Sequence, residues 1–198
     1  MANNKQKGGN FEREICKQLS LWWSKGKTDD IFWRTAGSGA RATQRQRRGT
    51  GKTFGQDGDM QATNPIGQPF IDLFTVELKR GYKEATLSSL IDAPSGAKLQ
   101  PFMHFIEQAH RSAKNAGTPY WLIIHKKDRR ETMIYYPRDF WCAATKIKLV
   151  NIPNTIGLKL PSLRLQGGSV YGSPLDQWLE KITPNHLKAL KRETIEGL

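Results

Sequence analysis

The stretch FTVELKR, residues 74–80, decides the fold, because it combines the pattern of a buried strand with charged residues at its end. Side chains alternate between the two faces of a strand, so its three even-numbered apolar residues share one face, which can pack beneath a helix. Glu77 and Lys79 share the other face and project together, roughly 6–7 Å apart along the strand. A carboxylate and an ammonium placed in this way suit metal-assisted hydrolysis of a phosphodiester, although a surface salt pair is the commoner explanation of such a triplet.

Apolar periodicity on either side of this strand predicts an α/β fold. The segment after Asn10 and the segment 101–116 carry apolar residues at helical spacing. The flanks of NPIGQP (64–69) predict an antiparallel hairpin that joins 59–63 to 70–79. Further strands are predicted at 31–34, 119–125 and 131–136, and short helices at 138–144 and 173–182. This order indicates a mixed central β-sheet flanked by helices.

One carboxylate holds Mg²⁺ poorly, so the predicted strand needs an acidic partner. Asp59 lies across the predicted hairpin, within diagonal reach of Glu77. Asp57 is the alternative, deeper in the preceding loop, whereas Asp72 points to the opposite face of the strand. The pattern therefore favours a site that pairs Asp59 with Glu77.

The chain has 198 residues, enough for one domain with a substantial core, and a formal net charge of +13. Such an excess of Lys and Arg favours a polyanionic partner, nucleic acid before an anionic membrane surface. An apolar span of about 20 residues and a signal-peptide core are both lacking, which predicts an intracellular, cytoplasmic protein with no membrane partner. Two cysteines are too few for a Cys-rich zinc site.

Four short motifs occur in a fixed order, and together they resemble the PD-(D/E)xK nuclease superfamily. They are GGNFERE (8–14), WRTAGSG (33–39), GDM (58–60) and VELK (76–79). Within that superfamily they are more similar to the archaeal-type Holliday junction resolvases and their phage and bacterial relatives. The resemblance covers residues 8–80 well, and it implies a restriction-endonuclease-like core in a protein of bacterial or phage origin.

The resemblance also implies roles for individual positions. Glu12, Asp59, Glu77 and Lys79 match the catalytic and metal-site residues, and the Leu78 carbonyl matches a further metal ligand. Arg34 and Ser38 match positions near the DNA backbone and the active site. Only the resemblance favours Glu12 over Glu14, because both flank the same apolar stripe and both suit the first turn of a helix. The implied cofactor is Mg²⁺, for which Mn²⁺ can substitute.

Residues 40–58 separate the AGS turn from the GD motif, where the resembled family has a short link. This insertion is rich in Arg and Gly and nearly free of aliphatic residues, which predicts a basic loop. Its basic residues are Arg41, Arg45, Arg47, Arg48 and Lys52. Their position beside the predicted site favours a DNA-contacting loop, and a solvated insertion with no such role is the alternative.

The sequence thus predicts a flexible leader at 1–9, a nuclease core at 10–136 with the basic insertion, and a C-terminal extension at 137–198 packed on the core. The predicted function is Mg²⁺-dependent hydrolysis of DNA, in branched DNA such as a four-way junction, as in recombination or repair. Symmetrical cutting of a junction requires two active sites, so a homodimer is expected. A restriction-like or mismatch-type duplex endonuclease and a non-catalytic DNA-binding protein are the alternatives.

Overall fold

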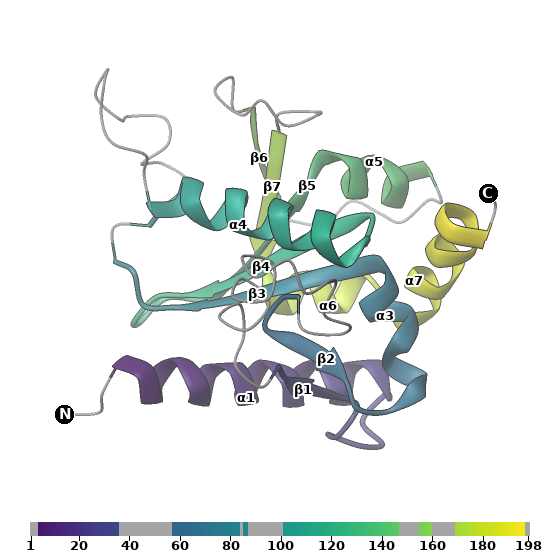
Figure 1. Ribbon diagram of the computed structural model, residues 1–198, viewed down its shortest axis with the longest axis horizontal. Coiled ribbons are helices and arrows are strands. Elements are labelled where there is room, and N and C mark those ends of the chain that lie inside the picture. Colours follow the sequence, from purple (N-terminus) through teal and green to yellow (C-terminus); the bar gives the residue numbers. More distant parts are fainter. Residues whose placement is uncertain are drawn as a thin grey trace, which may run out of the picture.

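The computed structural model describes residues 4–35, 57–83, 85–86, 101–146, 155–159 and 169–196, which form a mixed sheet with helices on both faces (Figure 1). Five strands lie in the order β3 (Phe74–Arg80), β4 (Tyr120–Lys126), β5 (Thr132–Pro137), β7 (Ser169–Pro174) and β6 (Ile156–Lys159). β3 and β4 are parallel, and the other neighbouring pairs are antiparallel. The predicted fold class, an α/β restriction-endonuclease-like core, is confirmed.

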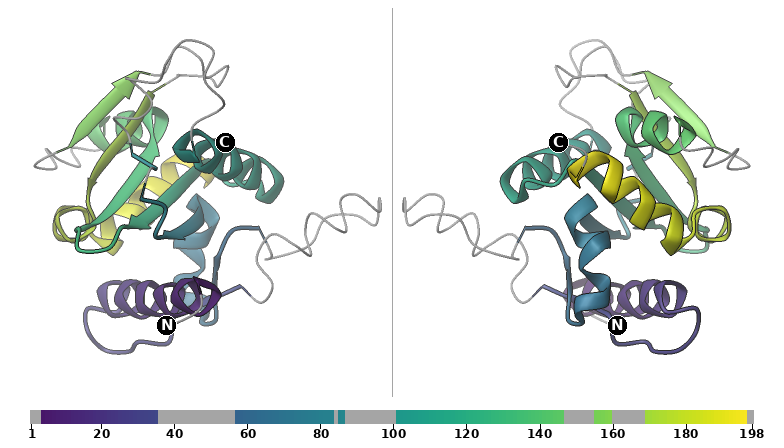
Figure 2. Two further views of the ribbon diagram at one scale, coloured as in Figure 1. Left: turned by 90° about the vertical axis from the view of Figure 1, so that its left-hand side faces the viewer. Right: turned by 90° about the vertical axis from the view of Figure 1, so that its right-hand side faces the viewer.

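Two helices lie on opposite sides of β3 (Figures 1 and 2). α4 (Pro101–Ala116) packs its apolar stripe on one face of the sheet, and α1 (Asn4–Trp23) packs Phe11 and Leu19 on the other. Gly117, with a φ of +76°, ends α4 as its position after the stripe predicts. On the α1 side the core is completed by α5 (Arg138–Lys146), α6 (Leu175–Lys181) and α7 (Pro184–Lys191), after which comes a π-helical turn, η3 (Arg192–Glu196).

Helix α1 begins at Asn4, whereas the sequence predicted a helix only after Asn10, so most of the predicted flexible leader at 1–9 is helical. The two glycines before Asn10 have low helix propensity, which favours a later start. In the structure a Cβ atom at Gly9 would lie 3.1 Å from a guanidinium nitrogen of Arg34. The glycine leaves room for Arg34 beside the helix, and tertiary packing outweighs local propensity.

The segment 64–73 forms two short helices where the sequence predicted a hairpin turn and the start of a strand. The 3₁₀ helix η1 (Pro65–Gly67) is followed by α3 (Gln68–Leu73), which ends where β3 begins. Asn64 caps η1 through its side chain, and a proline lies in the first turn of each helix. The predicted hairpin is therefore wrong, because these prolines start helices instead of marking a turn.

β2 (Met60–Ala62) pairs with β1 (Phe32–Arg34) in a separate antiparallel sheet of two strands. Asp59, directly before β2, nevertheless reaches β3, because its backbone N–H donates to the Val76 carbonyl at 2.7 Å. The proximity of Asp59 to Glu77 thus comes from a close approach of two chain segments and not from hairpin register.

The C-terminal segment belongs to the same sheet and core as the residues before it. β7 lies between β5 and β6, and Trp178 on α6 packs in the same apolar cluster as Phe11 on α1. The predicted boundary between 136 and 137 therefore does not separate an extension from the core. Over the described parts of the chain, no helix is both long and apolar enough to span a bilayer.

Candidate active site

The side chain of Glu77 on β3 is held by three hydrogen-bond donors beneath helix α4. The Ser112 hydroxyl donates to Oε1 at 2.9 Å, and the Gln108 amide donates to Oε2 at 2.6 Å. The Lys79 ammonium donates to the same Oε2 at 2.8 Å. Gln108 and Ser112 lie one helical turn apart, so they approach β3 from the same side of α4. Glu77 is only 2 % exposed, and its face of the strand is covered by α4.

Lys79 lies between the two carboxylates of the candidate site. Its Nζ is 2.8 Å from Glu77 Oε2 and 3.9 Å from Asp59 Oδ2, and it donates to Gln108 Oε1 at 3.2 Å. Burial lowers the pKa of Lys79, but the charges of Glu77 and Asp59 outweigh this effect and raise it. The side chain therefore stays a cation that links two acidic groups.

A close approach of two backbones places Asp59 against the edge of β3. Its Oδ2 accepts a hydrogen bond from the Leu78 N–H at 2.8 Å. Gly58 has a φ of +81°, and a Cβ atom there would lie 2.8 Å from the Val76 carbonyl oxygen. Glycine suits both this backbone conformation and this space, so Gly58 determines where Asp59 lies.

The Leu78 carbonyl faces the same edge of β3. In a strand the N–H and C=O of one residue point to the same side, and the Leu78 N–H points to Asp59. The parallel partner β4 lies along the other edge of β3. The carbonyl is therefore directed toward Asp59 and away from the ladder with β4.

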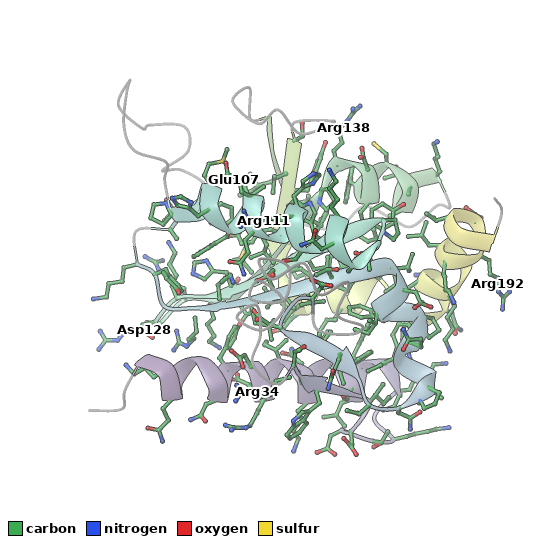
Figure 3. All side chains as sticks on the ribbon, in the orientation of Figure 1. Arg34, Glu107, Arg111, Asp128, Arg138 and Arg192 are labelled. Carbon is green, nitrogen blue, oxygen red and sulfur yellow. The ribbon has the colours of Figure 1, made fainter. Side chains whose placement is uncertain are left out.

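Glu12 approaches the site from α1. Its Oε2 lies 3.0 Å from Nε of Arg34, which Figure 3 shows beside α1. Burial raises the pKa of Glu12, the charge of Asp59 raises it further, and Arg34 opposes both effects. Glu14 is exposed. The structure thus separates two glutamates that helical periodicity left equivalent, and it brings Glu12 into the field of Asp59.

A sequence model of one protein family matches residues 3–189 of the chain, and the family is described as "Phage putative PDDEXK endonuclease". The chain belongs to this family. The match extends from α1 to α7 and confirms the resemblance to PD-(D/E)xK nucleases and their phage relatives. A search of curated proteins and a search of solved structures found no match.

The structure brings together three of the residues that the PD-(D/E)xK resemblance selects: Asp59, Glu77 and Lys79. Glu12 pairs with Arg34, and burial and the charge of Asp59 raise the pKa of Glu12. Asp72, weighed as an alternative, lies on α3 and pairs with Lys191 at 2.9 Å. Ser38, Arg41, Arg45, Arg47, Arg48 and Lys52 lie outside the described residues. Gln108 and Ser112 complete the set of groups around Glu77, and their one-turn spacing on α4 is the sequence signal that could have selected Ser112.

The acidic side chains of the candidate site can be compared with the ligands that a divalent cation needs. Across the described segments, no three His, Cys, Asp or Glu side chains lie close enough together to hold a metal ion by themselves. Mg²⁺ usually takes one or two protein carboxylates and completes its shell with water and substrate phosphate. Burial raises the pKa of Glu77, the charge of Lys79 lowers it, and the charge of Asp59 raises it. Burial thus disfavours the charged form of Glu77, and a bound cation would favour that form.

Proposed function

We propose that this chain is a divalent-metal-dependent DNA endonuclease that hydrolyses phosphodiester bonds. The observation that carries the proposal is the convergence of Asp59, Glu77 and Lys79, from two separate chain segments, at one edge of β3. Buried charges contribute little net stability, and apolar residues of similar volume often stabilise a fold more. Three charges in one buried site therefore favour a chemical role over a structural one, as does membership of the endonuclease family.

Mg²⁺, or Mn²⁺ in its place, would be held by Asp59, Glu77 and the Leu78 carbonyl, with Glu12 as a direct or water-mediated ligand. When bound, it would supply a Lewis acid for the phosphate and lower the pKa of the attacking water. The carboxylate and carbonyl oxygens of this set are the ligands that such a hard cation prefers.

The other groups of the site position the reactants. Lys79 carries hydrogen-bond donors at the junction of the two carboxylates, where it can orient the attacking water or stabilise charge on the phosphate. Gln108 and Ser112 hold the Glu77 carboxylate in one orientation. Arg34, at the outer side of Glu12, can neutralise a neighbouring phosphate of the substrate.

The proposed substrate is branched DNA, with a four-way junction favoured. The net charge of +13 supports a polyanionic ligand, and the resemblance to junction resolvases supports a branch point. The basic residues between 41 and 52 are proposed to neutralise phosphates near the site. Because a junction is resolved by two symmetrical cuts, we propose that the active species is a two-fold homodimer.

The test is cleavage of an end-labelled four-way junction, a flap and a linear duplex, each with and without Mg²⁺. We expect Mg²⁺-dependent cutting that is faster on the junction than on the duplex. Glu77→Ala should slow cutting by at least about a hundredfold, because several kcal/mol of charge stabilisation depends on the metal site. Glu14→Ala is the matched control, an exposed glutamate on α1 that should leave the rate unchanged.

Three other outcomes of the cleavage test would each lead to a different conclusion about the function. Undiminished cleavage by Glu77→Ala would overturn the assignment of the site. Faster cutting of linear duplex at defined sequences would replace the junction proposal by a restriction-like function. Salt-dependent binding with no Mg²⁺-dependent cleavage would identify a non-catalytic DNA-binding protein.

A further inference from the structure

The turn after β3 presents an aromatic side chain in an unusual backbone conformation. Tyr82 has a φ of +54° and is 56 % exposed. Positive φ at a bulky residue is an outlier, and such residues cluster at ligand-binding and active sites. Burial of the ring does not account for this conformation, because more than half of the residue is accessible to solvent.

Three hydrogen bonds fix this turn. The Gly81 N–H donates to the Lys126 carbonyl, the His125 ring Nε2–H donates to the Gly81 carbonyl, and the Ala85 N–H donates to the Tyr82 carbonyl, each at 2.9 Å. A carbonyl only accepts, so His125 carries its proton on Nε2. The turn therefore presents Tyr82 in a position set before any ligand binds, which reduces the entropy lost on binding.

Phe105 on α4 connects Tyr82 to the candidate active site. The two rings meet edge to face with centroids 5.0 Å apart, and the Lys79 ammonium lies 5.7 Å from the centroid of the same Phe105 ring. Burial lowers the pKa of Lys79, and Tyr82 is among the groups that raise it, after Glu77 and Asp59. The exposed tyrosine and the cation that is proposed to act on the phosphate thus both lie against the Phe105 ring.

We propose that Tyr82 stacks on a nucleobase next to the phosphate at Lys79 and thereby selects DNA in which the face of a base is open. The inference takes the identity of its ligand from the proposed nuclease function. Aromatic side chains stack on any base, so such a contact carries no sequence preference. In a continuous duplex both faces of each base are covered by neighbouring bases, whereas a branch point, flap or strand end leaves a face open. Tyr82 would therefore recognise a discontinuity in DNA.

The test is equilibrium binding of a fluorescein-labelled four-way junction and of a continuous duplex of the same length, measured by anisotropy without divalent metal. Tyr82→Leu keeps an apolar contact with Phe105 but removes the aromatic face, and it should weaken junction binding about tenfold and duplex binding by less than about twofold. Tyr82→Phe keeps the ring and should bind both like the natural chain. Trp33→Leu is the matched control, because Trp33 is another exposed aromatic residue, on β1.

Unchanged junction binding by Tyr82→Leu, or equal weakening for junction and duplex, would overturn the inference. The same selective loss in Trp33→Leu would overturn it too. A second measurement covers the case in which Tyr82→Leu does not fold. The affinity of the natural chain is measured for a series of junctions, each with a single abasic site at a different position. One position beside the branch should then lose about tenfold in affinity, and a flat profile would overturn the inference.

Cleavage is measured in parallel to keep the two proposals apart. If Tyr82→Leu selectively weakens junction binding but the natural chain shows no Mg²⁺-dependent cleavage, the nuclease function is wrong and the stacking contact stands. If Glu77→Ala abolishes cleavage while Tyr82→Leu leaves junction binding unchanged, the stacking contact is wrong and the nuclease function stands.

Discussion

The two faces of β3 are equally buried and opposite in chemistry. On the α1 side, Phe74, Val76 and Leu78 lie in one apolar cluster. On the α4 side, Glu77 and Lys79 carry opposite charges under a helix that covers them. The exposed fraction is 0 % for Val76 and 2 % for Glu77, so burial alone does not distinguish a core position from a site position on this strand.

The faces differ in what their burial does to stability. Apolar side chains gain free energy when they leave water, roughly 25 cal/mol per Å². Charged side chains lose hydration, and they are tolerated only when partners replace it. Glu77 has three such partners, two of them from α4. One face of β3 therefore stabilises the fold, and the other holds the charges of the candidate site together.

The largest effect is expected on the apolar face, from Phe74→Ala. The Phe74 ring packs against those of Phe70, Tyr120 and Phe140. Its removal leaves a cavity, so the free energy of unfolding should fall by about 3–5 kcal/mol in urea denaturation. Phe74→Leu, which fills most of the space, should lose less. A loss below about 1 kcal/mol would show that this face is not the stabilising one.

On the charged face, Lys79→Met should lower the free energy of unfolding by about 3 kcal/mol, because it leaves the buried Glu77 charge without its cation. The double variant Glu77→Gln with Lys79→Met should recover most of this loss, since no uncompensated charge remains. Urea denaturation of the single and double variants measures the coupling. Additive losses would mean that the two charges do not depend on each other.

At the edge between the faces, Gly58→Ala should destabilise the fold by about 1–3 kcal/mol, because its φ is positive and its space is occupied by the β3 backbone. The displaced Asp59 should slow cleavage as well. Gly8→Ala is the matched control in helix α1, where a Cβ atom meets nothing within 4 Å. It should stabilise the chain by up to about 1 kcal/mol, and equal effects of the two substitutions would contradict this account.

The smallest effect concerns the pH dependence of stability in Glu12→Gln. Burial and the charge of Asp59 raise the pKa of Glu12 in the folded chain. The folded state therefore binds this proton more tightly than the unfolded state, and stability is lost as the pH rises through the interval above the ordinary glutamate pKa of 4.5. The glutamine of Glu12→Gln does not titrate, so the melting temperature of this variant should fall less over that interval. A parallel decline in both chains would place Glu12 away from the field of Asp59.

Sequence reasoning succeeded where one segment carries its own signal. The apolar stripe of 101–116 and the glycine after it predicted α4 correctly. The parity of β3 correctly placed Phe74 on the core side and Glu77 on the other. Sequence reasoning failed where contacts with other parts of the chain determine the local structure. The prolines of 64–69 suit both a turn and a helix start, and the buried residues of α3 favoured the helix.

By itself, the sequence determined the family, the elements with strong periodicity, and the residue types of the site, because these depend on local spacing and on the order of motifs. Tertiary structure alone decided how Asp59 reaches β3 and that Ser112 holds Glu77. These outcomes depend on backbones and side chains that approach across long stretches of chain. Such contacts depend on how the whole core packs, so no single segment of the sequence predicts them.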